Sequence, residues 1–184
     1  MSAQQRIAII SDIHGNIPAL KSVLADIATQ GVDSIYCLGD LIGKGPQNDV
    51  AVDMCHDYCA AVVRGNWDSN ISALNAEEHE TSHWVRTQLG KERLDYLRNL
   101  PNTIDLQFAG RRIRLFHASQ VNEHTRVKIY DSRKMHSQMF ENTAFTGLNA
   151  PLPELVGYGD IHAAFALPLP NSHKTLFNVG SVGN

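Results

Sequence analysis

The chain has 184 residues, of which 43% are hydrophobic and 19% charged, a composition that fits an ordinary globular protein and argues against disorder. Its formal net charge of -3 supplies no basic surface for a long nucleic acid, so we expect no stable nucleic-acid binding. The N-terminus has no signal-peptide pattern, and no apolar run approaches the ~20 residues needed to cross a bilayer. These features predict one cytoplasmic domain over residues 1–184 that does not bind membranes.

The N-terminal third of the chain alternates between apolar runs and helical patterns. Short runs such as RIAII are rich in β-branched residues and are typical of buried parallel strands. Pro18 and Gly31 suit the first turn and the end of the first helical pattern. We expect strands at 6–10, 34–38 and 60–64, and helices between Pro18 and Gly31 and over 47–59. This order predicts a parallel sheet with helices on its faces.

The remainder of the chain predicts a charged helical region, a hairpin and further strands. The segments TIDLQF and RRIRLF, joined by Ala109-Gly110, indicate a hairpin. The mixed charges over 86–98 predict a solvated helical face. We also expect helix within 70–99, a short helix near 132–141, and strands at 154–158, 163–167 and 174–179.

Five short polar segments each follow a predicted strand. They are Asp12-Ile13-His14, Gly39-Asp40, Gly65-Asn66-Trp67-Asp68, His117-Ala118-Ser119 and Gly159-Asp160-Ile161-His162. Any one of them would be a weak signal, because short motifs match by chance. In open α/β sheets, however, ligands gather where the carboxyl ends of the strands meet. We therefore expect these segments to come together at one edge.

The side chains of these segments are typical of a centre for divalent metal ions. They supply carboxylates, imidazoles and one amide, a mixed nitrogen and oxygen set that suits Mn, Fe, Zn or Ni. The candidate ligands are Asp12, His14, Asp40, Asn66, His117, Asp160 and His162. Seven ligands exceed what one tetrahedral site uses, so we expect two ions that share a bridging carboxylate.

In chain order the segments read D-x-H, G-D, G-N-x-[DE], H-x-S and G-x-x-H, and this order resembles the calcineurin-like metallophosphoesterases. The resemblance runs from residue 6 to the end, where NVGSVGN is similar to a segment of the small bacterial members. The form G-N-W-D resembles a bacterial subgroup of phosphodiesterases and diadenosine tetraphosphate hydrolases. The resemblance implies a four-layer α/β/β/α sandwich. It leaves open whether C-terminal strands are lacking after Asn184.

The resemblance also implies a role for each candidate ligand. Asp12, His14 and His162 would bind the first metal, Asp40 would bridge, and Asn66, His117 and Asp160 would bind the second. A hydroxide between the metals would attack the phosphorus of a small phosphorylated or nucleotide substrate, breaking a phosphodiester or phosphoanhydride bond. Asn66 and His117 are thus expected at the catalytic centre, and Asn66 is also a candidate hydrogen-bond donor to the phosphate.

One departure from the family pattern concerns the leaving group. Trp67 stands where many members have a histidine that protonates it, and an indole N–H cannot act as an acid near neutral pH. This favours good leaving groups such as a nucleotide phosphate. Trp67 either stacks on a substrate base, which is worth roughly 1–3 kcal/mol, or packs as a wall of the site. Asp68 is a candidate for steering a histidine or a water, and Arg126 for binding an anionic substrate.

A second departure concerns Asp160, which stands where the family usually has histidine. A carboxylate adds negative charge and a harder donor, which favours Mn or Mg at the second site and makes Mn the first expectation overall. The alternative is a second site that is only weakly occupied.

Two other functions stay open. One relative of this fold is a trafficking scaffold with an impaired metal centre, so a non-catalytic scaffold is one alternative, and a phosphomonoesterase or protein phosphatase is the other. An exposed sheet edge would also allow a homodimer. Outside the site, we expect Cys37, Cys55 and Cys59 to be small buried residues and five histidines to lie at the surface, namely His79, His83, His124, His136 and His173.

Overall fold

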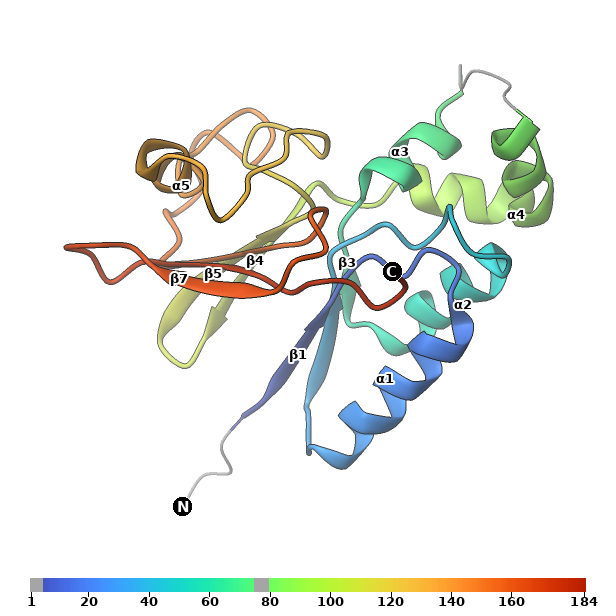
Figure 1. Ribbon diagram of the computed structural model, residues 1–184, viewed down its shortest axis with the longest axis horizontal. Coiled ribbons are helices and arrows are strands. Elements are labelled where there is room, and N and C mark those ends of the chain that lie inside the picture. The colour runs from blue at the N-terminus through green and yellow to red at the C-terminus, as the bar shows by residue number, and fades with distance from the viewer. Residues whose placement is uncertain (1–4, 75–79) are drawn as a thin grey trace.

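The computed structural model describes residues 5–74 and 80–184, which form two β-sheets packed face to face with helices on their outer faces (Figure 1). The apolar layer between the sheets contains buried side chains from both, including Leu38, Val63, Ile113 and Leu115. A second cluster lies between the first sheet and its helices. A third lies on the outer face of the second sheet. The expected four-layer α/β/β/α arrangement is therefore confirmed.

The first sheet has three parallel strands in the order β1-β2-β3. They are β1 (Ile7–Ile10), β2 (Ser34–Cys37) and β3 (Ala61–Val62), and β3 is shorter than the predicted run. Two helices cover one face of this sheet, α1 (Ile17–Thr29) and α2 (Asn48–Tyr58). At the start of α1 the Asn16 side chain accepts a hydrogen bond from the Ala19 amide at 3.2 Å, as an N-cap residue does.

Two further helices follow β3. They are α3 (Asn66–Ser72) and α4 (Glu80–Arg98), which Gly90 interrupts with φ of 67°. Val85, Leu89 and Leu97 of α4 are fully buried in the cluster between the first sheet and its helices. The prediction of a solvated face over 86–98 is therefore wrong for one side of this helix, because its apolar side packs against α2 and α3.

The second sheet has five strands in the order β4-β5-β6-β8-β7. They are β4 (Thr103–Phe108), β5 (Arg111–Phe116), β6 (Leu155–Tyr158), β7 (Phe165–Pro168) and β8 (Thr175–Asn178). The β4-β5 hairpin turns at Ala109 and Gly110, whose φ angles are 49° and 77°. Positive φ at both positions is the geometry of a tight hairpin turn. Strands β5, β6 and β8 are parallel, so their carboxyl ends lie at the same edge.

The outer face of the second sheet is covered mainly by the long connection between β5 and β6. This connection contains one short helix, α5 (Arg133–Gln138). His136 of α5 is 3% exposed, and its Nε2 atom lies 2.9 Å from the Lys128 carbonyl oxygen. The prediction of a surface position is therefore wrong for His136, because its buried side chain contacts the backbone of the connection to which it belongs. His79 lies outside the described residues.

The remaining sequence predictions concern cysteines and membrane contact. Cys37 and Cys55 are buried and Cys59 is partly buried, all three as free thiols. Within residues 5–74 and 80–184, no helix combines the length and the apolar character that crossing a membrane requires.

Candidate metal centre

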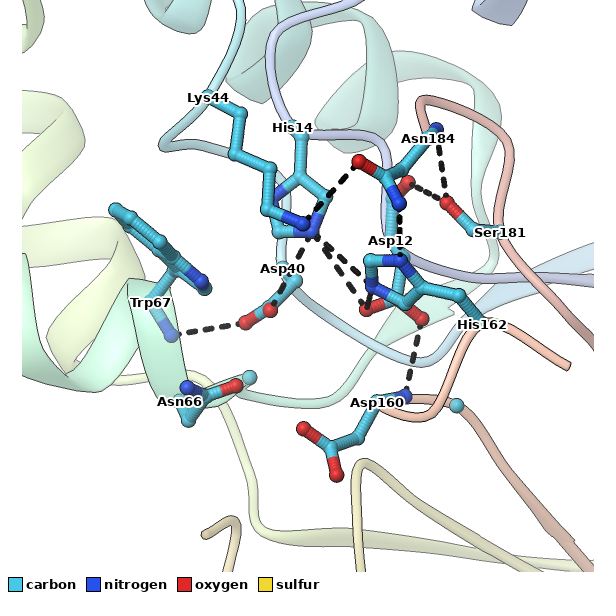
Figure 2. A network of polar contacts seen from close by, with 12 residues as sticks. Asp12, His14, Asp40, Lys44, Asn66, Trp67, Asp160, His162, Ser181 and Asn184 are labelled. Atoms are coloured by element: carbon cyan, nitrogen blue, oxygen red, sulfur yellow. Dashed lines mark hydrogen bonds and ion pairs between the residues drawn. The ribbon is translucent and has the colours of Figure 1, made fainter. Parts of the chain in front are cut away.

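The candidate ligands come together where the carboxyl ends of the strands of both sheets meet. Figure 2 shows Asp12, His14, Asp40 and His162 facing one another, with Asn66 and Asp160 beside them. Of the seven non-glycine residues with positive φ in the described part of the chain, five are candidate ligands: Asp12, His14, Asp40, Asp160 and His162. Such backbone costs energy in a non-glycine residue and persists where the surroundings hold it, most often at functional sites.

One group of converging atoms comprises Asp12, His14 and His162, whose ligand atoms all lie within 4.8 Å of one another. The His162 Nε2 atom lies 3.0 Å from Asp12 Oδ1 and 3.4 Å from His14 Nε2. His14 and Asp12 are almost fully buried. One carboxylate and two imidazoles at these separations can bind a single divalent cation.

A second group comprises Asp12, Asp40 and His117, again with all ligand atoms within 4.8 Å. His117 Nε2 lies 3.5 Å from Asp40 Oδ1 and 3.0 Å from Asn66 Oδ1. Asp40 is also 3.8 Å from His14 Nε2 through its other oxygen. Asp40 therefore faces both groups, as a bridging carboxylate must.

Two of the imidazoles are oriented by backbone carbonyls. His14 Nδ1 lies 3.0 Å from the Ile42 oxygen, and His117 Nδ1 lies 2.7 Å from the Leu38 oxygen. A carbonyl only accepts, so each Nδ1 carries a proton, and Nε2 is the ring nitrogen that each histidine directs toward the centre. Metal-binding histidines are fixed in this way. The residues present therefore fit divalent cations.

Asp160 is placed differently from the other carboxylates. Its Oδ1 atom is 4.0 Å from His117 Nε2, and both of its oxygens accept from Arg126 Nε, at 3.2 and 3.1 Å. Arg126 is 60% exposed at its side chain. The structure thus brings Asp160 to the second group and also pairs it with an arginine.

Burial and charge act against each other on the titratable groups here. Burial lowers the pKa of His117, but Asp40 and other neighbours outweigh it and raise that pKa to about 10. Burial opposes ionisation of Asp12, yet the hydrogen bond from His162 brings the pKa of Asp12 below its usual value. Burial raises the pKa of Asp160 despite His117 and Arg126. Concentrated negative charge therefore favours a cation at this place, whether a proton or a metal.

Asp68 lies beneath the centre, and its carboxylate accepts hydrogen bonds from backbone amides. Its carboxylate accepts from the amides of Asp40, Leu41 and Gly65 at 2.8, 3.0 and 2.9 Å. Burial and the Asp40 charge raise the pKa of Asp68 to about 7 against these donors. A Cβ atom at position 65 would overlap Asp40, so glycine is required there. Asp68 thus joins the ends of β2 and β3 and holds Asp40 in place.

The C-terminal segment packs directly behind the first group of ligands. The Ser181 hydroxyl and the Gly183 amide both donate to the Asp12 carbonyl oxygen at 2.9 Å. The Asn184 side-chain amide lies 2.8 Å from His162 Nδ1. Sequence reasoning matched this segment to a family pattern but assigned Ser181 and Asn184 no role, because no local signal shows what a chain end will contact.

A cavity of about 490 Å³ opens over the centre. Its lining includes Asp40, Asp160 and His162 together with Lys44, Trp67, Arg126, Lys128, Ile161 and Asn184. Trp67 packs against Gly43 and meets the His14 ring edge-on, with 6.0 Å between ring centroids. A larger cavity of about 630 Å³ lies between α5 and the β7-β8 turn and contains none of the candidate ligands. We place the site at the smaller cavity because the ligands line it.

Comparison with known proteins agrees with this geometry. The chain is 32% identical over 119 residues to the uncharacterised protein MJ0912 of Methanocaldococcus jannaschii, covering 61% of this chain and 49% of that protein. It is 31% identical over 101 residues to phosphodiesterase YfcE of Escherichia coli, covering 48% of this chain and 54% of YfcE. The chain thus spans about half the length of these curated relatives.

A solved structure matches over nearly the whole chain. The metallophosphoesterase from Sphaerobacter thermophilus superposes with a TM-score of 0.75 at 28% identity, covering 98% of this chain and 78% of that one. The family model for the calcineurin-like phosphoesterase superfamily domain matches residues 6–184. With these ligands at the common edge of two stacked sheets, the chain belongs to the calcineurin-like phosphoesterase superfamily.

Proposed function

We propose that this protein is a hydrolase of phosphodiester or phosphoanhydride bonds in a small, nucleotide-like substrate and that it works with two divalent metal ions. The observation that carries the proposal is the convergence of two ligand groups on Asp40. A single ion would not use both groups. The name of the relative YfcE, a phosphodiesterase, supports the same class of reaction.

The metals would be held by the seven side chains described above. Asp12, His14 and His162 would hold one ion, Asn66, His117 and Asp160 the other, and Asp40 both. Mn is the first expectation, with Fe, Zn, Ni or Mg as alternatives, because the set mixes nitrogen with hard oxygen donors. When bound, two such ions lower the pKa of a water nucleophile and offset the charge of the phosphate.

The chain's own side chains would position the substrate. Asn66 lies at the first position of α3, beside His117, where its amide can bind a phosphate oxygen. Arg126 uses Nε for Asp160, which leaves its terminal amino groups to meet an anion. We assign Asp68 the role of positioning Asp40 rather than of steering a water, because its hydrogen bonds go to backbone.

The leaving group decides which phosphate esters suit the site. Trp67 lies where an acid would be useful, and its backbone amide donates to Asp40 Oδ1 at 2.9 Å. Its indole cannot protonate a departing oxygen. Alcohols leave poorly without a proton, whereas nucleotide phosphates and phenolates leave well. This chemistry favours nucleotide-linked diesters and anhydrides over alkyl monoesters and phosphoproteins.

The direct test is a Mn-dependent assay of the purified chain on four substrates: an aryl diester, an aryl monoester, diadenosine tetraphosphate and a cyclic nucleotide. We expect hydrolysis of the diester or the tetraphosphate to exceed that of the monoester. Metal counting by mass spectrometry should give two ions per chain. A metal-loaded protein that hydrolyses none of the four would instead support the scaffold alternative.

Trp67→Ala separates the two roles of the indole. If Trp67 stacks on a base, the variant should lose roughly 5- to 150-fold more activity on a dinucleotide than on a base-free diester. Equal losses on both would leave Trp67 as a wall of the cavity, which its packing on Gly43 also fits.

A further inference from the structure

The loop over 41–47, between β2 and α2, lies against both His14 and Trp67. Its Ile42 carbonyl oxygen is 3.0 Å from His14 Nδ1, and a contact of this kind fixes the orientation of a metal-binding ring. Its Gly43 backbone packs so closely on the Trp67 indole that a Cβ atom at position 43 would overlap the ring. The place of this loop therefore controls a candidate metal ligand and a wall of the cavity.

A buried side chain at the start of α2, that of Asn48, holds this loop in place. Asn48 Oδ1 accepts from the Gly43 amide at 2.8 Å, and Asn48 Nδ2 donates to the Gly45 carbonyl oxygen at 3.1 Å. The Gly45 amide donates in turn to the His14 carbonyl oxygen at 2.6 Å. Asn48 thus joins two points of the loop, one beside Trp67 and one beside His14.

A second amide, Gln88 of α4, completes the support from 40 positions further along the chain. Gln88 Oε1 accepts from Asn48 Nδ2 at 2.9 Å, and Gln88 Nε2 donates to the Pro46 carbonyl oxygen at 2.7 Å. Both amides therefore use their oxygen as an acceptor and their nitrogen as a donor. Neither amide can be reversed without setting donor against donor or acceptor against acceptor, so each has one orientation.

The space around this pair of amides is tightly filled. A Cβ atom at Gly15 would lie 2.9 Å from Asn48 Oδ1, and one at Gly45 would overlap the His14 carbonyl oxygen. The Gly15 amide also donates to the Leu41 carbonyl oxygen at 2.9 Å. Because the loop and the segment that carries His14 touch along their backbones, a shift of the loop is passed on to the His14 ring.

From these contacts we infer that Asn48 and Gln88 are positioning residues of the metal centre. Their hydrogen bonds go to the backbone of the loop and to each other, so they act through the loop. They keep the Ile42 carbonyl oxygen on His14 and the Gly43 backbone under Trp67. The inference rests on the proposed function for its consequence in catalysis and extends it to two residues outside the cavity lining.

Four variants separate the parts of this support. Asn48→Ala removes both bonds to the loop, whereas Asn48→Asp keeps the acceptor for Gly43 and loses the donor to Gly45. Gln88→Ala leaves Asn48 in place and removes only its partner, and because Gln88 is half-buried this variant carries the test if Asn48→Ala does not fold. Gln47→Ala is the matched control, since it removes an exposed amide from the same loop.

The affinity for Mn, measured by calorimetry after chelator treatment, is the first readout. His14→Ala identifies the affinity that belongs to the His14 half of the centre, because it removes a ligand of that half. We expect this affinity to fall roughly tenfold in Asn48→Ala and Gln88→Ala, while the other affinity changes less than about threefold. Asn48→Asp should recover part of the loss, and Gln47→Ala should match the wild-type protein.

The fluorescence of Trp67 in metal-free protein is the second readout. The chain has two tryptophans, so Trp84→Phe leaves Trp67 as the single emitter. In that background, Asn48→Ala and Gln88→Ala should shift the emission to longer wavelength and increase quenching by iodide, because the indole loses its support on Gly43. Gln47→Ala should change neither.

A general loss of stability and a positioning role give different results. Equal losses in both Mn affinities, or an unchanged affinity of the His14 half in a folded variant with unchanged Trp67 emission, would overturn the inference and leave the two amides as supports of the fold alone. Neither readout depends on turnover. A wild-type protein that shows the expected binding and emission but hydrolyses no phosphoester would overturn the proposed function and leave the inference standing.

Discussion

The two halves of the candidate metal centre differ in what holds their side chains. In the half built from Asp12, His14 and His162, the main supports come from the backbone and the C-terminal segment. In the half built from His117 and Asp160, the imidazole is likewise fixed by a buried carbonyl, but the carboxylate is paired with an exposed arginine. The His14 ring of the first half is fixed by a buried contact and its His162 ring by an exposed amide, whereas in the second half a carboxylate that should bind metal is itself paired with a cation.

This difference has a consequence for how the two halves should bind metal. A ligand held by buried backbone is already oriented, so binding an ion costs little ordering. Asp160 must share its oxygens between a metal and Arg126. We therefore expect the first half to bind metal more tightly than the second, and four substitutions test this expectation.

The largest effect should come from Asp40→Asn, because Asp40 serves both halves. Replacing a carboxylate oxygen by an amide nitrogen removes one charge and one ligand shared by two ions. We expect kcat/KM on an aryl diester to fall by about 1000-fold and the metal content to fall below two per chain. Asp57→Asn, at an exposed position of α2, is the matched control and should behave like the wild-type protein.

Asp68→Ala should mainly reduce stability. It leaves three buried backbone amides without their acceptor, and each such group costs roughly 1–3 kcal/mol. We expect the free energy of unfolding in urea to fall by at least about 3 kcal/mol. Asp57→Ala should change it by less than about 0.5 kcal/mol. A stable Asp68→Ala protein that has lost activity would instead favour a direct part in the chemistry.

Asp160→Ala tests the second half alone. If Asp160 is a ligand, the weaker of two measured metal affinities should fall by roughly 10- to 100-fold while the tighter one stays the same. Isothermal titration with Mn after chelator treatment measures both. Asp160→His, which restores the residue usual in the family, should bring the second affinity back. A wild-type chain that binds only one ion would contradict the two-metal proposal.

The smallest effect should come from Asn184→Ala, which removes the amide beside His162 Nδ1. Loss of such an outer partner weakens metal binding by about tenfold, and we expect this loss in the tighter of the two affinities. Asn149→Ala, at an exposed position, is the control. If the weaker affinity changes instead, our assignment of the tighter site to the first half is wrong.

Much of the fold follows from local patterns in the sequence. The runs IAII and SIYC, the alternation around Ala109-Gly110 and the caps of α1 predicted strands, a hairpin and a helix that the structure confirms. Local patterns failed for His136 and for one side of α4. Neither burial follows from adjacent residues: His136 contacts the Lys128 carbonyl oxygen, and α4 packs against α2 and α3. The cytoplasmic location, the single domain and the homodimer stay predictions.

By itself, the sequence determined the element order and the residue types of the centre, because strand endings and ligand chemistry are both local properties. Only the tertiary structure decided how those residues share their contacts. It paired Asp160 with Arg126, placed Asp68 on three backbone amides and brought Asn184 to His162. Arg126 and Asp160 are 34 positions apart in the sequence, Asp40 and Asp68 are 28 apart, and Asn184 and His162 are 22 apart. Such contacts depend on how the two sheets stack and where the loops cross, which no local pattern records.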